Sequence, residues 1–156
     1  MPDLFLSLKL AHLLAAILMV GATVINGLIH NRARQAPSSK AGAMLSIVIA
    51  VNSYVMGPAL LALPLTGGAL IWAAGYDFKA LWVWLSVALS ILLIAAYVFG
   101  ARLERRLYEI AMSTERAGEA SLPVQYDRVF RKAAPVGVAA LLMSLATLGL
   151  MVFKPY

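Results

Sequence analysis

The sequence predicts an all-α protein whose four helices cross a membrane as one bundle. Three observations predict this fold class. Hydrophobic residues make up 62% of the 156 residues. Charged residues make up only 13% and lie in clusters, whereas a soluble domain of this size needs more polar surface. Four apolar runs are each long enough to span a bilayer, which takes roughly 20 helical residues. This length leaves space for a single integral membrane domain, residues 1–156.

The spans are expected at about residues 4–29, 43–65, 80–101 and 133–153. The second apolar run is uncharged over residues 41–76, which is more than one span requires. It contains Pro58, Pro64 and the pair Gly67–Gly68. We expect a helix that is kinked near Pro58 and followed by a turn and a short interfacial stretch. Two alternatives stay open: a helix that continues to about Trp72, and a re-entrant hairpin near Pro64–Gly68.

The basic residues predict the orientation of the bundle. Ten of them lie in the first and third loops and three lie on the other side: Arg32, Arg34, Lys40, Arg102, Arg105, Arg106, Arg116, Arg128, Arg131 and Lys132 against Lys9, Lys79 and Lys154. Because loops rich in lysine and arginine stay in the cytoplasm, both termini are expected on the periplasmic side. The net charge of +6 therefore sets orientation and indicates no nucleic-acid partner.

The third loop, residues 102–132, is the largest piece expected outside the bilayer. It begins as a helical extension of the third span, and Gly118 is the expected end of that helix. Glu104 and Glu109 lie along the extension among arginines. We expect a solvated amphipathic helix on the cytoplasmic face. Since no acidic residue falls inside an expected span, a carboxylate proton relay is not predicted.

The two histidines, His12 and His30, both fall on the first span. Their separation of 18 residues is five whole helical turns, which places them on one face about 27 Å apart. One metal ion or haem iron cannot take both from one subunit. His30 is expected at the cytoplasmic edge, either as an interfacial polar residue or as a second functional site. His12 lies inside the span, either as a ligand or proton carrier or as a packed histidine.

A single imidazole inside a helical bundle fits a non-covalent b-type haem. The chain has no cysteine, which excludes thiolate metal sites, iron–sulfur clusters and covalent c-type haem. Met56 and Met143 are expected at about the depth of His12 and are the candidates for a second axial ligand, with packing as the alternative role. Copper is also bound by imidazole and thioether groups, but the sequence has no Met-x-x-Met cluster and no His–His pair.

Five segments carry a resemblance to a known family: LKLAHLLAAILMVG at 8–21, His30 with Arg32 and Arg34, Pro58 followed by PLTGG at 64–68, LPVQYDRVFR at 122–131, and LMVFKP at 150–155. In their order and spacing the chain resembles domain-of-unknown-function family 2269, small bacterial predicted integral membrane proteins, over nearly its whole length. A glutamine commonly precedes the Pro–Thr–Gly segment in that family, and Leu63 takes that place here. The resemblance implies a multi-pass protein of the bacterial inner membrane.

The pattern Leu-Lys-x-x-His, followed by small residues and glycine, is also similar to that of small membrane protoporphyrinogen oxidases and copper-resistance membrane proteins. The first-helix histidine of the oxidases is implicated in haem binding. The resemblance therefore implies that His12 binds haem b, with Lys9 one turn nearer the outer surface and able to pair with a haem propionate. The alternative for Lys9 is an ordinary lysine that extends to the membrane interface.

The expected function is electron transfer, or the handling of haem or a porphyrin, by a small membrane b-type haem protein. Whether the protein is an enzyme stays open, and the class expected of an enzyme is a membrane oxidoreductase with quinone as a partner. Two alternatives also stay open: a cofactor-free accessory or scaffold subunit of a larger membrane complex, and a small-molecule or metal transporter that acts as a homodimer. The polar residues Asn26, Asn52 and Thr66 support the transporter hypothesis.

Overall fold

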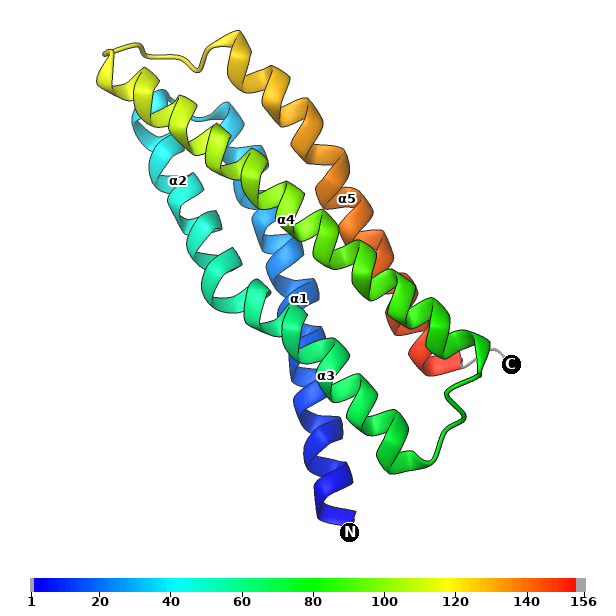
Figure 1. Cartoon of the computed structure of the whole chain (residues 1–156). Helices are drawn as coiled ribbons and strands as arrows, with labels where there is room; N and C mark the ends of the chain where they lie inside the picture. Colours follow the sequence, from blue (N-terminus) through cyan, green and yellow to red (C-terminus); the bar gives the residue numbers. More distant parts are fainter. Residues whose placement is uncertain (1, 154–156) are drawn as a thin grey trace.

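The computed structural model describes residues 2–153, which form an antiparallel helical bundle (Figure 1). The elements are α1 (Pro2–Gln35), α2 (Ser38–Val51), the π-helical segment η1 (Asn52–Met56), α3 (Gly57–Ala74), α4 (Leu81–Arg116) and α5 (Val124–Phe153). Because α2, η1 and α3 follow one another without a break, the bundle has four helices that are long and apolar enough to cross a membrane. The all-α, four-span prediction is thereby confirmed.

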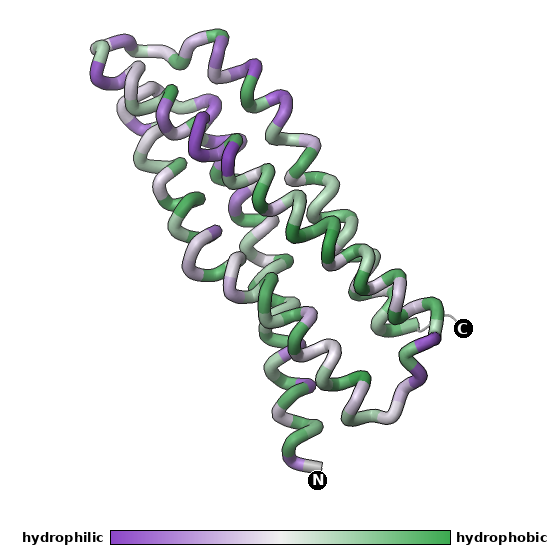
Figure 2. The backbone as a smooth tube through the Cα atoms, viewed as in Figure 1, coloured by the Kyte–Doolittle hydropathy of each residue, from purple (hydrophilic) through white to green (hydrophobic). Residues whose placement is uncertain are grey.

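The two ends of the bundle differ in polarity. The α1–α2 turn and the α4–α5 loop lie at one end, named here the basic end, where hydrophilic residues gather (Figure 2). The beginning of α1, the α3–α4 loop and the end of α5 lie at the other, named the terminal end (Figure 1). That the basic end faces the cytoplasm stays a prediction. Lys154, which was counted in that prediction, lies outside the described residues.

The structure of the second span differs from the prediction of a helix that ends near Leu65 and is followed by a turn. The helix runs through Gly67 and Gly68 to Ala74, which is the alternative in which it continues. Gly67 lies at a close contact between α3 and α1 and not in a turn, because a Cβ atom at this position would lie 3.2 Å from Cε1 of His12. The helix ends at Gly75, whose φ of 67° is in the left-handed region that favours glycine.

The irregularity in this span is the π-helical turn at η1, ahead of Pro58. The backbone N–H of Gly57 donates to the carbonyl oxygen of Asn52, five residues earlier. The hydroxyl of Tyr97, on α4, donates to the same oxygen over 3.0 Å. A side chain at position 57 would put its Cβ atom 2.9 Å from the Tyr97 hydroxyl. Glycine at this position therefore allows α4 to stabilise the widened turn, and π-turns of this kind are frequent at functional sites.

Helix α4 extends about four turns beyond the charged start of the expected third loop, to Arg116. The connection to α5 is accordingly short, residues 117–123, and Gly118 within it has a φ of 73°. Ser38 ties this connection to the start of α2: its hydroxyl donates to the carbonyl oxygen of Glu119, and its N–H donates to that of Ala120 over 3.2 Å. The basic end is thus a closed, packed structure.

Two hydrophobic clusters hold the helices together. The basic-end cluster joins α1, α2, α4 and α5 through the buried residues Ala33, Ala41, Leu45, Leu107, Ala111 and Tyr126. The mid-bundle cluster joins α1, α3 and α4 through Ala15, Met19, Ala59, Leu60 and Leu93. Small residues in both clusters allow close helix contact, which is the usual basis of helix association in membranes. Between and beyond these clusters lie the polar sites.

Candidate functional site

A cavity of about 610 Å³ lies at the terminal end between α1, α3, α4 and α5. It exists because α3 packs mainly against α1, whereas α4 packs mainly against α5 and α2. Its walls are largely apolar, with residues such as Phe5, Leu63, Trp82, Ile94 and Val152. Residues of the mid-bundle cluster, Met19, Leu60 and Leu93, also line it. Its volume falls in the range of ligand pockets, roughly 300–1,000 Å³.

His12 is one of the titratable side chains of α1 that line this cavity, and Lys9 is another. The imidazole of His12 contacts α3. Its Nδ1 atom lies 2.7 Å from the hydroxyl oxygen of Thr66, on α3. The single hydroxyl proton of Thr66 is already donated to the carbonyl oxygen of Ala62 over 2.6 Å. When that proton is donated to Ala62, Thr66 accepts a hydrogen bond from Nδ1–H of His12, because a hydroxyl has only one proton to donate. In this tautomer Nε2 of His12 has a free lone pair.

The segment PLTGG at residues 64–68 builds the wall opposite the imidazole. Thr66 orients the ring, and Gly67 provides the space in which the ring lies against α3. Pro64, Gly67 and Gly68 all line the cavity. The sequence analysis used this segment only to mark a family resemblance and named Thr66 only as a polar residue. A hydroxyl residue followed by two glycines inside an apolar span was the signal that could have indicated a close helix contact.

Of the other sequence-predicted ligands, Lys9 lies at the same cavity, whereas Met56 and Met143 do not line it. Lys9 lines the cavity one turn from His12, toward the terminal end. Met56 belongs to η1, and Met143 packs against the mid-bundle cluster. Neither methionine is among the cavity-lining residues, whereas Met19 and Met151 are. The structure thus brings His12 and Lys9 together at one cavity, and the second axial role of Met56 or Met143 stays a prediction.

A second polar site crosses three elements nearer the basic end. The amide nitrogen of Asn26, on α1, donates to Oδ1 of Asn52, on η1, over 2.7 Å. The amide nitrogen of Asn52 donates in turn to Oε2 of Glu104, on α4. The other carboxylate oxygen, Oε1, lies 3.1 Å from Nε2 of His30. We call these four residues the Asn–Asn–Glu–His network.

The position of Glu104 corrects the sequence analysis. Glu104 was expected on a solvated helix, yet its side chain is only 16% exposed and that of His30 only 14%. The reason is that α4 continues straight past the apolar run, so that Glu104 faces α1 and η1 instead of water. The polar residues Asn26, Asn52 and Thr66, considered together in the sequence, also separate. The two asparagines join Glu104, and Thr66 joins His12.

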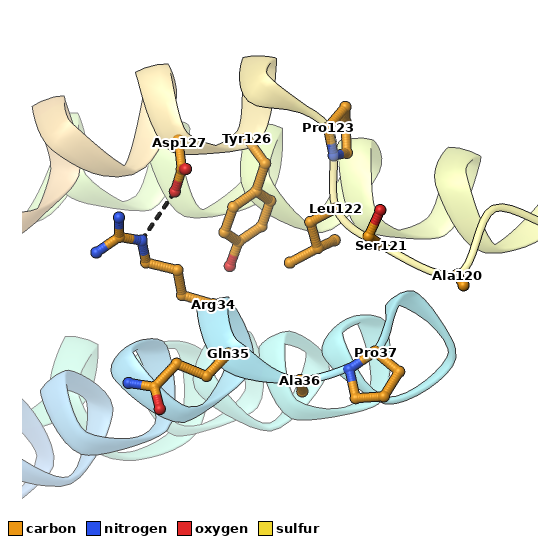
Figure 3. Close-up of a pocket in the computed structure, with 10 residues that line it drawn as sticks. All are labelled: Arg34, Gln35, Ala36, Pro37, Ala120, Ser121, Leu122, Pro123, Tyr126 and Asp127. Atoms are coloured by element: carbon orange, nitrogen blue, oxygen red, sulfur yellow. Dashed lines mark hydrogen bonds and ion pairs between the residues drawn. The ribbon is translucent and has the colours of Figure 1, made fainter.

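A third site is a pocket of about 340 Å³ at the basic end, between the α1–α2 turn and the start of α5 (Figure 3). Nε of Arg34 donates to Oδ1 of Asp127 over 2.8 Å, and the guanidinium lies 5.0 Å from the ring centre of Phe130. The ring of Tyr126 extends from α5 toward the α1–α2 turn. Since both members of the ion pair are about 40% exposed or more, this pair contributes little to stability.

Metal chemistry is restricted by the side chains present. Among residues 2–153, no group of three or more histidine, cysteine, aspartate or glutamate side chains could hold a metal ion.

Comparison with known proteins identifies the chain at the level of its family. Residues 6–155 match the family described as "Predicted integral membrane protein (DUF2269)". No curated protein matches significantly, and no solved structure does. The match covers nearly the whole chain, and it agrees with the four membrane-length helices of the structure. The chain is therefore a member of the DUF2269 family of integral membrane proteins.

Proposed function

We propose that this protein binds a b-type haem, or a closely related porphyrin, in the terminal-end cavity and uses it for electron transfer or porphyrin handling. The observation that carries the proposal is the hydrogen bond from Nδ1–H of His12 to Thr66. A histidine that ligates a metal usually donates its other ring N–H to a neighbouring acceptor, which orients the ring. His12 has this arrangement at the wall of a largely apolar cavity.

The donor set fits the group on three points. The free Nε2 atom of His12 is an axial base, and the absence of cysteine from the sequence excludes covalent haem attachment. Lys9, one turn away on the same helix, can pair with a propionate carboxylate. Residues of the mid-bundle cluster, among them Met19, Leu60 and Leu93, give the cavity an apolar wall. When bound, haem would supply one-electron redox chemistry.

The protein residues have separate roles in this proposal. His12 holds the group, and Thr66 keeps the Nδ1 proton in place, so that Nε2 stays available. Gly67 lets α3 approach the ring closely enough for Thr66 to reach it. The apolar walls set the burial of the group, which with the axial ligand determines its potential. We further propose that the protein works in the bacterial inner membrane with a quinone as redox partner, as an oxidoreductase or an electron carrier.

The test is an absorption spectrum of detergent-purified protein, oxidised and dithionite-reduced, after expression with added haem. We expect a Soret band that sharpens on reduction, and we expect it to disappear in His12→Ala. The matched control is His30→Ala, which removes the other histidine of α1 and should keep the band. A colourless wild-type protein would overturn the proposal and favour the alternative of a cofactor-free accessory subunit. A band that survives His12→Ala unchanged would overturn the assignment of His12 as the ligand.

Replacing Thr66 tests the orientation of His12 separately from its presence. In Thr66→Val the side chain keeps its shape but no longer accepts from Nδ1–H. Because such second partners of metal ligands typically contribute 10- to 100-fold to affinity, we expect haem to bind about 10- to 100-fold more weakly. Thr147→Val is the control, because Thr147 lines the same cavity and its hydroxyl donates to Met143 of its own helix. Haem titration should show equal weakening in both variants only if the Thr66 contact has no special role.

A further inference from the structure

We propose that the Asn–Asn–Glu–His network is a proton-binding site, at which His30 and Glu104 together take up one proton from the basic end of the bundle. The proposal is independent of any cofactor, because the network lies apart from the residues that line the terminal-end cavity. An ionisable side chain within a membrane bundle is costly and by default indicates function. Here two such side chains are paired between α1 and α4.

The directions of the hydrogen bonds in the network are fixed. Glu104 is an acceptor at Oε2, so Asn52 must present its amide nitrogen to it. Asn52 then presents Oδ1 to Asn26, which must donate from its own amide nitrogen. Rotating either amide by half a turn would place two oxygens or two N–H groups together. Asn26 is therefore left with its oxygen as an acceptor, and this oxygen is buried without a partner among the described residues.

A second buried atom without a partner lies on the same face of α1. Nδ1 of His30 is buried and has no hydrogen-bond partner within residues 2–153. Residues 26 and 30 are one helical turn apart, where side chains are neighbours. When the Glu104–His30 pair holds one proton, Nε2–H of His30 donates to the carboxylate and Nδ1 is a bare acceptor. Two buried acceptors, Nδ1 of His30 and Oδ1 of Asn26, then belong to residues one helical turn apart, and neither has a partner among the described residues.

One added proton removes this mismatch. It turns His30 into an imidazolium, which keeps its hydrogen bond to Glu104 through Nε2–H and gains a donor at Nδ1–H. Oδ1 of Asn26, one helical turn away on α1, is a buried acceptor without a partner among the described residues, and we infer that it receives this donor. No bond other than the new N–H bond forms, and no charge is stranded, because Glu104 stays ionised opposite the imidazolium. The network is thus complete only with the additional proton.

The other charged groups near this end do not provide an alternative partner. Helix α3 has no charged residue, and Lys40, the charged residue of α2, is exposed. Tyr97 donates to the backbone at Asn52, Tyr54 is exposed, and Tyr108 packs against the basic-end cluster. Among the acidic side chains of this end, Glu109, Glu115 and Glu119 are exposed and Asp127 pairs with Arg34. The remaining basic side chains of this end are all exposed: Arg32, Arg34, Arg102, Arg105, Arg106, Arg116, Arg128, Arg131 and Lys132. His30 and Glu104 are the titratable pair that faces the interior.

The experiment uses the full chain labelled with ¹⁵N- and ¹³C-histidine, together with labelled asparagine, in lipid nanodiscs. Nitrogen NMR distinguishes protonated from bare ring nitrogens, and the chain has two histidines, which His30→Gln assigns. Spectra are recorded from about pH 8 to about pH 5, the range in which imidazoles commonly change charge. At the acid end we expect both ring nitrogens of His30 to be protonated, with a through-space correlation between Nδ1–H and the side chain of Asn26.

Two variants identify the groups that hold the proton. In Glu104→Gln, we expect fewer His30 side chains than in the wild type to carry both ring protons at the acid end, because the carboxylate opposite the imidazolium is absent. In Asn26→Leu we expect a decrease as well, because Nδ1–H loses its acceptor. Glu109→Gln is the matched control: it removes the same charge from the same helix at a side chain that is 64% exposed, and His30 should not change.

The wild-type spectrum tests the proposal even when a variant fails to fold. A His30 ring that is still neutral at about pH 5 would overturn it. So would a ring whose protonation is the same in Glu104→Gln as in the wild type. An acid-end Nδ1–H without a correlation to Asn26 would contradict the assignment of Asn26 as the second partner.

Discussion

Replacing Tyr126 by alanine is expected to lower the free energy of unfolding by about 3–5 kcal/mol, the usual cost of truncating a buried aromatic side chain. Tyr126 is 1% exposed and is the largest side chain of the basic-end cluster. It lies among residues from α1, α2 and α4, including Ala33, Leu45 and Leu107, so its loss leaves a cavity at the meeting point of four helices. Membrane association cannot replace these contacts, because lipid does not reach them.

Replacing Tyr126 by phenylalanine, in contrast, is not expected to lower the free energy of unfolding. The hydroxyl oxygen of Tyr126 is buried and has no hydrogen-bond partner among the described residues. Because a buried unpaired polar group costs free energy, removing it should leave the stability unchanged or raise it by about 1 kcal/mol. Unfolding in one detergent, followed by circular dichroism, compares both variants with the wild type. A clear loss of stability in Tyr126→Phe would show that the hydroxyl has a partner, such as a buried water.

Arg34→Ala is the control for these two variants at the same pocket. Arg34 contacts Asp127 and Phe130 near Tyr126 (Figure 3), but its side chain is 40% exposed. Its removal should therefore change the free energy of unfolding by no more than about 1 kcal/mol. A large loss in Arg34→Ala would mean that the α1–α5 contact depends on the ion pair instead of on the buried ring.

The number and class of the helices could be predicted because the bilayer imposes a length on each apolar run. An 18- to 25-residue stretch without charges has few alternatives to a membrane helix. The continuation of α3 through Gly67 and Gly68 was not settled in the same way. Glycine permits both a turn and a close helix contact, and His12, 55 positions earlier in the chain, decides between them by packing against Gly67.

Some residues of the candidate sites could likewise be predicted from the sequence, and others could not. The sequence indicated His12 because an imidazole inside an apolar run is unusual by itself, and the family resemblance added Lys9. The sequence did not indicate Glu104, which follows the third apolar run on the same helical extension as the solvated Glu109. Only the positions of α1 and η1, which contribute partners 74 and 52 residues away in the chain, bury one glutamate and not the other. Such separations leave no periodic signal in one sequence.

Removing the central amide of the network should have the second large effect on stability. In Asn52→Leu, Glu104 loses a donor to its carboxylate and Asn26 loses the acceptor for its amide nitrogen. A hydrogen bond to a charged group contributes about 1.5–3 kcal/mol, and an amide that is left buried and unpaired costs about 1–3 kcal/mol. We therefore expect the free energy of unfolding to fall by about 3–5 kcal/mol, measured in the detergent used for Tyr126.

A double variant separates the loss of the amide from the burial of an unpaired charge. In Asn52→Leu/Glu104→Leu the carboxylate is absent, so no charge is stranded between α1 and α4. Because replacing both partners of a buried polar pair by apolar groups is often close to neutral, the double variant should be more stable than Asn52→Leu alone. If the effects of the two substitutions on the free energy of unfolding add fully, the contribution of Asn52 to stability does not depend on Glu104. The network would then consist of two independent contacts. If they compensate, the carboxylate is maintained at a cost to stability, which is the expected condition of a side chain kept for binding a proton.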